Sequence, residues 1–402
     1  MVHDYDVITV GGGLGGAALA KSLAEKGIRV LVLERETVFR DKVRGEYMHP
    51  WGVAETRTLG IYELLKQTCG YEVRYRVNQI SGAPPAKPRD MVATSPLQAG
   101  SLQFYHPAMQ EVLLKAAAQA GAEVLRGAAV EEVSPGPVPS VHVQVGGKEH
   151  AYRARLVVGA DGRTSNCRKW GNFTVQRDPG RMVLAGVLFD GLSAPNHTVQ
   201  VFTNTSLGEV GFLIPLGGTR FRCYAGFYQQ NGRRRLSGQK DADDFVATTV
   251  SSGACREWFA DAEIAGPLAS FDCAEAWVNH PYRAGVVLVG DAAATSNPVF
   301  GCGLSLTLRD VRVLSNLLLS EADWDSAAHT YAVEHDRYFG AIHRLLDRLV
   351  QLYFEPGPIA AARRERAFAR IGEDPRRAPD IPGLGPESPS NDTAYRNLFG
   401  ED

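Results

Sequence analysis

The chain has 402 residues, of which 44% are hydrophobic and 22% are charged, and its formal net charge is −2 at pH 7. This length can bury a substantial core in two or three domains, and the near-neutral charge gives no reason to expect nucleic acid or an anionic membrane as a partner. No stretch approaches about 18 uncharged apolar residues, and the first predicted strand begins at Tyr5, so we expect a cytoplasmic protein without a signal peptide or membrane span.

The six cysteines are scattered along the chain, without a Cys-x-x-Cys pair or the Cys/His spacing of a metal site. We therefore expect free thiols in a reducing compartment and no bound metal. The sequence also lacks a His-Glu-x-x-His motif, a Walker loop and a nucleophile elbow. These absences argue against the common classes of hydrolase and metalloenzyme.

The most informative segment lies at the N-terminus, where an apolar run enters the pattern Gly11-x-Gly13-x-x-Gly16 and a second apolar run ends at Glu34. This order predicts a strand, a turn, a helix and a strand, which is typical of dinucleotide-binding folds. Gly11 permits the tight turn, Gly13 lets the backbone approach a pyrophosphate, and Gly16 lets the helix pack close to the strand.

The remaining residues of this segment refine the choice of cofactor. The N-terminus of the helix offers unpaired amides and the positive end of a dipole to the phosphates. Glu34 can accept hydrogen bonds from both hydroxyls of an adenosine ribose, which favours FAD or NAD over a cofactor with a 2′-phosphate. We expect further contacts at Leu14 and Gly15 in the turn and at Arg35 beside the acid.

The composition and the spacing of apolar residues change twice in the middle of the chain. Residues 81–100 are rich in Pro, Gly and Ala, so an irregular excursion is expected at 76–95. A helix is expected from about Pro107 to Ala120. Residues 181–275 contain short alternating apolar runs between Gly, Asn and Pro turns, which favours an antiparallel sheet. After residue 286 the α/β pattern returns, with a long helix after Gly303, and the tail from Pro356 predicts a terminal helix and a loosely ordered end.

Three motifs follow one another along the chain: the glycine pattern, LVVGADGRTSNCRKW at 156–170 and VVLVGDAAATSNPVFGCGLSLTLRD at 286–310. In this order and spacing, the chain resembles the para-hydroxybenzoate hydroxylase-like FAD-dependent monooxygenases, the single-component aromatic hydroxylase superfamily. The resemblance covers roughly residues 1–340.

The resemblance implies a mixed α/β fold, in which a Rossmann-type FAD-binding domain is interrupted by a mostly antiparallel β-sheet substrate domain. The expected boundaries are 1–75, 96–180 and 276–340 for the FAD-binding domain, 76–95 for the irregular excursion, 181–275 for the substrate domain and 341–402 for C-terminal helices and a tail.

The resemblance also implies roles for residues of the second and third motifs. Asp161 would lie at the FAD pyrophosphate, Asp291 at the ribityl chain, and Arg44 on the phosphate side of the cofactor. The loop that begins at Pro298 would face the pyrimidine end of the flavin, where the N-terminus of the next helix stabilises negative charge. The residues expected there are Gly301, Gly303 and Leu304.

The chemistry implied by the resemblance starts with reduction of FAD by NADH or NADPH and continues through a flavin hydroperoxide formed with O₂. A small substrate, expected to be aromatic, is then hydroxylated or epoxidised, with no metal and no nucleophile from the protein. The site needs a dry pocket and a group that tunes the protonation of the substrate. No catalytic residue is certain, and the weak candidates are Tyr47, His49 and Tyr224. Candidate wall residues on the predicted sheet are Phe189, Phe202, Phe212, Pro215, Tyr224 and Phe227.

Three alternatives remain open on the same scaffold. A flavin-dependent halogenase would carry two tryptophans in the segment 211–215, where this chain keeps only the Ile-Pro, and Lys87 is a lysine to consider for such chemistry. A prenyl double-bond reductase would transfer a hydride without oxygen. An escort-type protein would keep the fold without catalysis, against which the three FAD motifs argue. The sequence leaves the oligomeric state open between monomer and homodimer.

Overall fold

The computed structural model describes residues 3–43, 45–229 and 233–401. In this part of the chain, the first large sheet has eight strands, and five of them run parallel in the order β21-β11-β1-β2-β8. Strand β20 pairs antiparallel with β21, and β9 and β10 form a hairpin layer on the first half of β11. The bounds are β1 Tyr5–Val10, β2 Val30–Glu34, β8 Glu123–Arg126, β9 Ala128–Ser134, β10 Ser140–Val145, β11 Lys148–Gly159, β20 Tyr282–Arg283 and β21 Val286–Leu288.

The central segments of the parallel strands, such as Val30–Leu33 of β2 and Leu156–Val158 of β11, are apolar because both faces of this sheet are covered. On one face, Val7 packs in a cluster with four helices, and on the other Ile8 packs against the β9–β10 hairpin. The helices are α1 Leu14–Ala24, α5 His106–Gln119, α8 Gly303–Ser320 and α9 Trp324–Tyr353. A Cβ atom at Gly16 would lie 1.9 Å from the carbonyl oxygen of Gly11, so the approach of α1 to the turn after β1 requires glycine.

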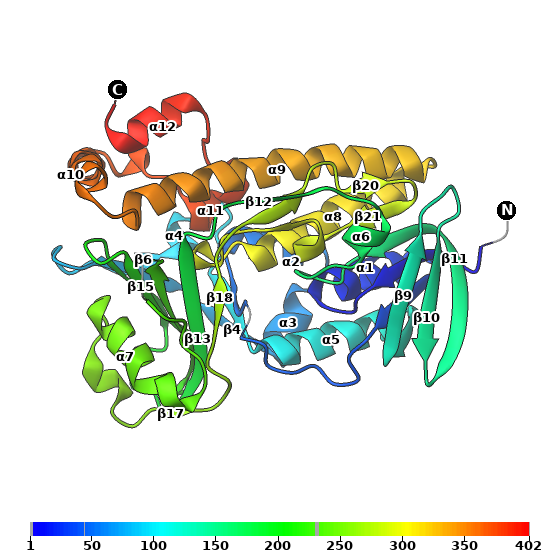
Figure 1. Ribbon diagram of the computed structural model, residues 1–402, viewed down its shortest axis with the longest axis horizontal. Coiled ribbons are helices and arrows are strands. Elements are labelled where there is room, and N and C mark those ends of the chain that lie inside the picture. The colour runs from blue at the N-terminus through cyan, green and yellow to red at the C-terminus, as the bar shows by residue number, and fades with distance from the viewer. Residues whose placement is uncertain (1–2, 44, 230–232, 402) are drawn as a thin grey trace.

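The second large sheet has eight strands in the order β17-β13-β16-β15-β14-β5-β6, with β18 also paired to β13. Its strands alternate between two faces, as the predicted antiparallel pattern requires. One face packs on α7 (Ala242–Ser251), and the other turns toward the first sheet (Figure 1). The bounds are β5 Tyr75–Ile80, β6 Arg89–Asp90, β13 Met182–Asp190, β14 Thr198–Asn204, β15 Glu209–Gly217, β16 Arg220–Tyr228, β17 Glu263–Ile264 and β18 Ala269–Asp272.

The irregular excursion expected at residues 76–95 is wrong for much of that segment. Strand β5 runs parallel to β14, β6 pairs with β5, and the short helix α4 (Met91–Thr94) follows. Arg76, Asn78 and Gln79 interrupt the apolar pattern that marks a strand, and the Pro-rich turn after Ile80 dominates the local composition. The segment therefore belongs to the sheet that the sequence placed wholly within residues 181–275.

Two three-stranded sheets and short helices link the large sheets. One small sheet has the order β3-β7-β4 and the other β12-β19-β22. Their bounds are β3 Tyr47–Met48, β4 Gly70–Val73, β7 Ser101–Phe104, β12 Val175–Arg177, β19 Ala276–Val278 and β22 Ala294–Thr295, and the helices beside them are α2 Pro50–Thr58, α3 Tyr62–Thr68 and α6 Cys167–Trp170. All six cysteines are free thiols, as the sequence predicts.

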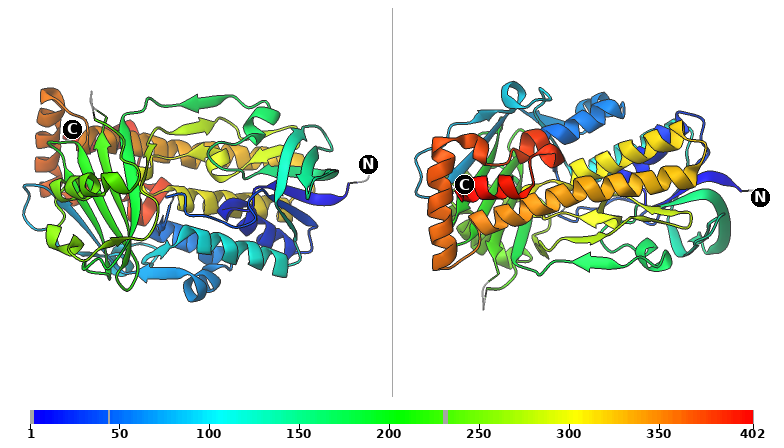
Figure 2. Two further views of the ribbon diagram at one scale, coloured as in Figure 1. Left: turned by 60° about the horizontal axis from the view of Figure 1, so that its bottom comes forward. Right: turned by 90° about the horizontal axis from the view of Figure 1, so that it is seen from above.

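Helix α9 runs along one side of the molecule and contacts both halves (Figures 1 and 2). Near its start, the Tyr331 hydroxyl donates to the carbonyl of Leu288 in the first sheet, and near its end Val350 joins the core of the second sheet. The C-terminal segment that follows is more regular than the loosely ordered end expected from its composition. It forms α10 Pro358–Glu373, α11 Ile381–Leu384 and α12 Asp392–Phe399, and Phe399 is fully buried against α10. Among the described residues, no helix is both long and apolar enough to cross a membrane.

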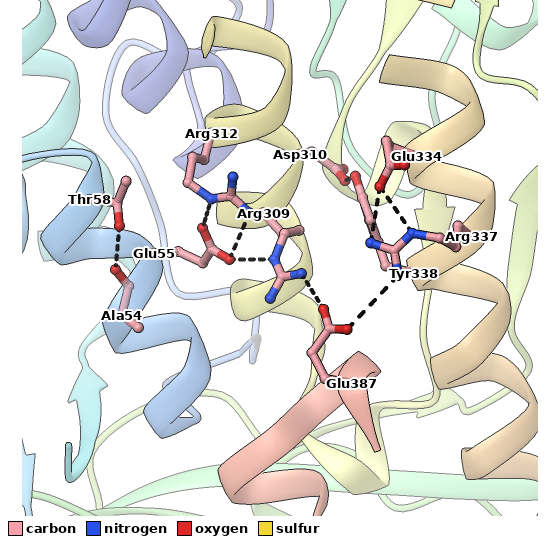
Figure 3. Close-up of polar contacts among 10 residues, drawn as sticks. All are labelled: Ala54, Glu55, Thr58, Arg309, Asp310, Arg312, Glu334, Arg337, Tyr338 and Glu387. Carbon is pink, nitrogen blue, oxygen red and sulfur yellow. Dashed lines mark hydrogen bonds and ion pairs between the residues drawn. The ribbon is translucent and has the colours of Figure 1, made fainter. Parts of the chain in front are cut away.

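Several ion pairs join helix α8 to neighbouring segments (Figure 3). Buried Glu55 on α2 binds both Arg309 and Arg312 on α8, and Arg309 also reaches Glu387 near the C-terminus at 2.9 Å. A buried carboxylate that holds two guanidinium groups is costly to remove, because both cations then lose their partner.

We predict that Glu55→Gln lowers the free energy of unfolding by about 2 kcal/mol, because each charged contact becomes a weaker neutral one. Chemical denaturation of the FAD-loaded protein measures this loss. Glu334→Gln is the matched control, since Glu334 pairs with Arg337 where both side chains are about half exposed, and its effect should stay below about 0.5 kcal/mol. Equal effects of the two changes would contradict the role of Glu55.

Candidate functional site

A cavity of about 590 Å³ lies between the carboxyl ends of the parallel strands and the inner face of the second sheet. Its volume is in the usual range for a ligand pocket. Residues at the ends of β1, β11 and β21 form one part of the wall, which is where open parallel sheets bind their ligands. Most of the residues expected at the cofactor lie on this wall: Gly11, Gly13, Leu14, Gly15, Glu34, Arg35, Asp161, Asp291, Pro298, Gly301, Gly303 and Leu304.

The glycine turn presents backbone to the cavity. Gly11 has a φ of +102°, and a Cβ there would meet the carbonyl oxygen of Ala160 at 2.5 Å, so this position requires glycine. Helix α1 begins after Gly13 without a side-chain cap, which leaves its first amides available to an anionic group. Gly16 is not on the wall and acts through the close packing of α1. Arg44 lies outside the described residues.

Glu34 ends β2 with its carboxylate at the cavity. One oxygen accepts from the Gly12 amide at 2.7 Å and the other from the Glu36 amide at 2.7 Å. A carboxylate can accept about four hydrogen bonds, so both oxygens keep capacity for a ligand hydroxyl. The two amides hold the side chain in one orientation toward the cavity.

The second motif begins where β11 reaches the cavity. Asp161 Oδ2 accepts from the amides of Asn166 and Cys167 at 2.7 and 3.1 Å, while its buried Oδ1 has no partner among the described residues. A buried acceptor without a donor is costly, and it fits a site completed by a ligand.

Arg168 joins the second motif to the third. Its Nε donates to the carbonyl of Ala292 at 2.7 Å, Nη2 to that of Asp291 at 2.6 Å and Nη1 to that of Arg163 at 3.2 Å. The side chain is buried, and this burial lowers the pKa of its guanidinium. All three nitrogens of the guanidinium therefore donate to backbone carbonyls.

The third motif is fixed from its other side by α8 and α9. The Gly290 amide donates to Asp310 Oδ2 at 2.6 Å, and the Tyr338 hydroxyl donates to the other oxygen of Asp310. Burial raises the pKa of Asp310. The adjacent Asp291 is thereby held at the cavity wall by contacts to its own backbone and that of its neighbour.

The loop after the third motif leads to the N-terminus of α8. Asn297 caps the turn Pro298–Phe300, and Gly301 then takes a φ of +68° with the Tyr47 ring 3.0 Å from where its Cβ would stand. Helix α8 starts at Gly303 with no side-chain cap, and no atom of the described residues lies within 4 Å of a Cβ built there. Two uncapped helix N-termini, those of α1 and α8, therefore open on the same cavity.

The opposite wall is the inner face of the second sheet. Strands β13 to β16 contribute apolar side chains and one tyrosine: Leu184, Val199, Phe212, Ile214 and Tyr224. Among the expected wall residues, Phe212 and Tyr224 lie on the cavity wall, whereas Phe189 and Phe202 pack on the α7 face. Pro215 and Phe227 do not line the cavity either. Aromatic residues occur on both faces of this sheet, so their presence does not show which face a residue belongs to. The face is set by whether the residue has an odd or an even position along its strand.

Next to Tyr224 lies a buried group of charges that the sequence did not reveal. The Tyr224 hydroxyl donates to Glu46, and Arg222 lies 3.2 Å from the other oxygen of Glu46 and 2.6 Å from Asp41. Burial raises the pKa of Glu46 from 4.5 to about 7, although Arg222 and Tyr224 both act to lower it. Burial also raises the pKa of Tyr224 well above its ordinary value. This pair can hold or release a proton beside the apolar wall near neutral pH.

The two other catalytic candidates lie beside the loop that begins at Pro298. Tyr47 lines the cavity, and its hydroxyl accepts from Arg76 Nη1 at 3.1 Å. His49 is buried off the wall and hydrogen-bonds the carbonyl of Phe300 through Nε2 at 2.7 Å. Burial, aided by the charge of Arg76, lowers the pKa of His49 to about 3, so its position favours holding the loop over accepting a proton.

Comparison with known proteins agrees with this geometry. The profile of a family described as an FAD binding domain matches residues 4–337. The chain is 27% identical to 6-methylpretetramide 4-monooxygenase of Streptomyces rimosus over 408 aligned positions, covering 92% of this chain and 89% of the relative. It is 25% identical to digeranylgeranylglycerophospholipid reductase 1 of Methanococcoides burtonii over 321 positions, covering 76% and 72%. The structure of the flavin-dependent brominase Bmp2 shares the fold, with a TM-score of 0.75, 16% identity and coverage of 98% and 93%.

We predict that Arg168→Lys weakens FAD binding about tenfold, or ~1.4 kcal/mol, because the single nitrogen of lysine cannot reach the carbonyls that three separate guanidinium nitrogens contact. Titration of the apoprotein with FAD, followed by the quenching of flavin fluorescence, measures the affinity. Lys169→Met changes an exposed cation at the next position and should leave the affinity within about twofold. An unchanged affinity in Arg168→Lys would show that the three carbonyl contacts do not shape the site.

We also predict a pH dependence of stability that belongs to Glu46. Because its pKa is raised on folding, its protonated form stabilises the protein at low pH, and this contribution is lost as the pH rises from about 4.5 to about 7. Glu46→Gln should remove that part of the slope when the free energy of unfolding is measured by denaturant at several pH values.

Tyr224→Phe gives a second measurement on the same group. Loss of the tyrosine hydroxyl removes a hydrogen bond that lowers the pKa of Glu46, so the decline should extend to higher pH. Identical slopes in the wild type, Glu46→Gln and Tyr224→Phe would contradict the assignment.

Proposed function

Because the chain belongs to the FAD-binding-domain family of para-hydroxybenzoate hydroxylase-like FAD-dependent oxidoreductases, we propose that it is a monooxygenase that uses NADH or NADPH and O₂ to oxygenate a small aromatic substrate. The observation that carries the proposal is the shared cavity. Three FAD motifs and an apolar sheet face line the same space, so a cofactor and a substrate can lie side by side away from water.

The residues present fit FAD. Two uncapped helix N-termini suit the phosphates and the electron-rich end of the flavin, and Glu34 suits the ribose. Asp161 keeps a buried oxygen that has no partner among the described residues. Bound FAD supplies the redox chemistry, which is acceptance of a hydride from the nicotinamide and delivery of one oxygen atom from O₂ to the substrate. The protein binds and orients both partners and keeps water out of the cavity.

In this proposal, the sheet of residues 181–275, with β5 beside it, supplies the substrate wall. Tyr224 is the polar side chain on β16 that faces the cavity, and Glu46 behind it can accept its proton. Arg222 balances the charge of Glu46 without taking part in transfer, because a guanidinium stays protonated. A hydroxyl or amine on the substrate could therefore exchange a proton with Tyr224 Oη while the ring reacts.

Two alternative activities are weighed against the cavity wall. A brominase-type reaction calls for a lysine near the flavin, yet among the described wall residues the one lysine is Lys42, on the segment after Glu34. Lys87 lies exposed on the turn after β5 and is not on the wall. A double-bond reductase is favoured by the archaeal relative, and the apolar sheet face would suit a prenyl chain.

The proposal is tested by turnover of the FAD-loaded protein with NADH or NADPH and a panel of phenols and aromatic acids under isotopically labelled oxygen gas. We expect substrate-stimulated nicotinamide oxidation and one labelled oxygen atom in the product. Product formation without oxygen would favour the reductase, and a brominated product in the presence of bromide would favour the halogenase. Nicotinamide oxidation that no substrate stimulates, with no labelled product, would contradict oxygenation of a substrate of this class.

A further inference from the structure

A carboxylate–histidine cluster lies outside the FAD cavity, where α9 passes the strands β12 and β19. It consists of Asp178, Glu275 and His343, and the ligating atoms of these three residues all lie within 4.8 Å of one another. None of these three described residues lines the cavity. Glu275 is buried, whereas Asp178 and His343 are partly exposed, so the cluster can be reached from solvent.

Strand register brings the two carboxylates of this cluster together. Arg177 at the end of β12 pairs with Ala276 at the start of β19. One position further, the Asp178 amide donates to the Glu275 carbonyl at 3.0 Å, so the two acids stand opposite each other. Like charges in this arrangement destabilise an antiparallel pair. Among the described residues, the ion pairs of these two carboxylates are with His343 alone.

His343 cannot satisfy both carboxylates with one hydrogen. Its Nε2 lies 2.8 Å from Asp178 Oδ2 and 3.5 Å from Glu275 Oε2. The Glu275 side chain is only 5% exposed, and its Oε2 has no hydrogen-bond partner among the described residues. The other oxygen of Glu275 accepts from the Asn297 amide at 2.6 Å, which holds Oε2 toward the cluster. A buried acceptor without a donor is costly, so this oxygen points to a further ligand.

The charge around the cluster favours a cation. Burial raises the pKa of Glu275 from 4.5 to about 8, although the Asn297 amide acts to lower it. The charges of Asp178 and Asp347 add to the rise. Arg181 lies 2.7 Å from Asp347 and so balances that acid. A cation that contacts all three ligating atoms of the cluster would remove the repulsion between the carboxylates and satisfy the buried oxygen at once.

The donor set of the cluster fits a divalent transition-metal ion. An imidazole nitrogen and two carboxylate oxygens are usual ligands of Zn²⁺, whereas Mg²⁺ and Ca²⁺ prefer oxygen ligands alone. Ligands that lie about 2.1 Å from a tetrahedral ion stand roughly 3.4 Å apart. The separations of 2.8 and 3.5 Å between His343 and the two carboxylates lie on either side of this value. Three protein ligands leave a fourth position for water.

We propose that Asp178, Glu275 and His343 bind one divalent transition-metal ion, with Zn²⁺ as the preferred ion, and that water completes its coordination. The His343 ring packs against Trp277 and Phe339, with centroids 4.6 and 5.9 Å apart, so its orientation does not depend on the ion. The inference goes beyond the proposed function, because the cluster is separate from the FAD cavity. The expectation of no bound metal rested on Cys and Cys/His spacing, which a site built from three distant segments does not display.

The test measures metal binding to the oxidised, FAD-loaded protein, so it needs neither substrate nor turnover. The protein is treated with a chelator, which gel filtration then removes. Calorimetric titration with Zn²⁺ and with Mg²⁺ reports the number of sites and their affinities. We expect one Zn²⁺ site per chain that depends on the cluster, with Mg²⁺ bound at least about a hundredfold more weakly. Saturating Zn²⁺ should also raise the thermal unfolding midpoint, since an ion that binds only the folded protein stabilises it.

Variants assign the Zn²⁺ site to the cluster. Glu275→Gln and Asp178→Asn keep the size of each side chain and remove its charge, and each should weaken Zn²⁺ binding at least about tenfold. His343→Gln removes the nitrogen ligand and should have a similar effect. Retained FAD affinity verifies that each variant is folded, and Glu275→Gln keeps an oxygen that can accept from the Asn297 amide.

His329→Gln is the matched control, because His329 lies on the same helix and also stands beside a carboxylate and another histidine. Its Nδ1 is 2.8 Å from His280 Nε2, and its Nε2 is 3.8 Å from Asp325. These contacts use different nitrogens of one ring, so they do not converge on one ion. The variant should bind Zn²⁺ with an affinity within about twofold of the wild type.

Three results would overturn the inference. The first is a wild-type protein with no Zn²⁺ site of Kd below about 10 μM. The second is equal Zn²⁺ affinity in the wild type, Glu275→Gln and Asp178→Asn. The third is Zn²⁺ binding that is lost in His329→Gln, or after the thiols are blocked, and kept in His343→Gln. Because no nicotinamide or substrate is present, each result is independent of whether the protein oxygenates a substrate.

Discussion

The site depends on one buried guanidinium, that of Arg168, which holds two distant segments of backbone together. A buried arginine without a carboxylate partner is tolerated only when its donors are satisfied, and three carbonyls from two motifs provide this. The geometry is therefore constrained from both sides, since moving either segment removes hydrogen-bond acceptors from a buried charge. Asp310 adds the complementary constraint by accepting from the Gly290 amide.

The two walls of the cavity serve different purposes because they are built from different elements. The cofactor wall presents backbone amides at the ends of parallel strands and at two helix N-termini, which bind charge without side-chain flexibility. The substrate wall is a pleated surface of side chains, so its chemistry is set by which residues point inward. Most are apolar, and the polar exceptions among the described wall residues of this sheet include Arg76, Ser270 and Tyr224, the last of which pairs with Glu46. Helix α9 holds the walls together by packing on both sheets.

The sequence predicted the cofactor wall well because its signals are contiguous. Each motif can be recognised within about thirty residues, from the spacing of glycines, from an acid that ends a strand, or from an Asp that follows a strand. The structure brings residues of all three motifs to one cavity. The pairing of Glu46 with Tyr224 joins positions 178 residues apart, and no local pattern encodes it. The acid at position 46 follows the glycine of a polar loop, where a solvated side chain is the ordinary expectation.

Two errors at the substrate wall share a physical origin. Phe189 and Phe202 were expected at the cavity because aromatic residues mark a core, yet this sheet has apolar layers on both faces. Strand β5 was missed because its polar residues and the Pro-rich turn after it hide the alternation of polar and apolar residues that marks a strand. Its pairing with β14 stabilises the strand. The position of Arg76 on the cavity wall was missed for the same reason.

The central claim is that three separated motifs hold one FAD with its ring open to the second sheet. A crystal structure of the protein with FAD tests this most directly. The account predicts the adenosine ribose at Glu34, the diphosphate at the amides of α1, and the isoalloxazine ring between the N-terminus of α8 and the wall that carries Tyr224. An isoalloxazine ring bound outside this cavity, or turned away from the second sheet, would contradict it.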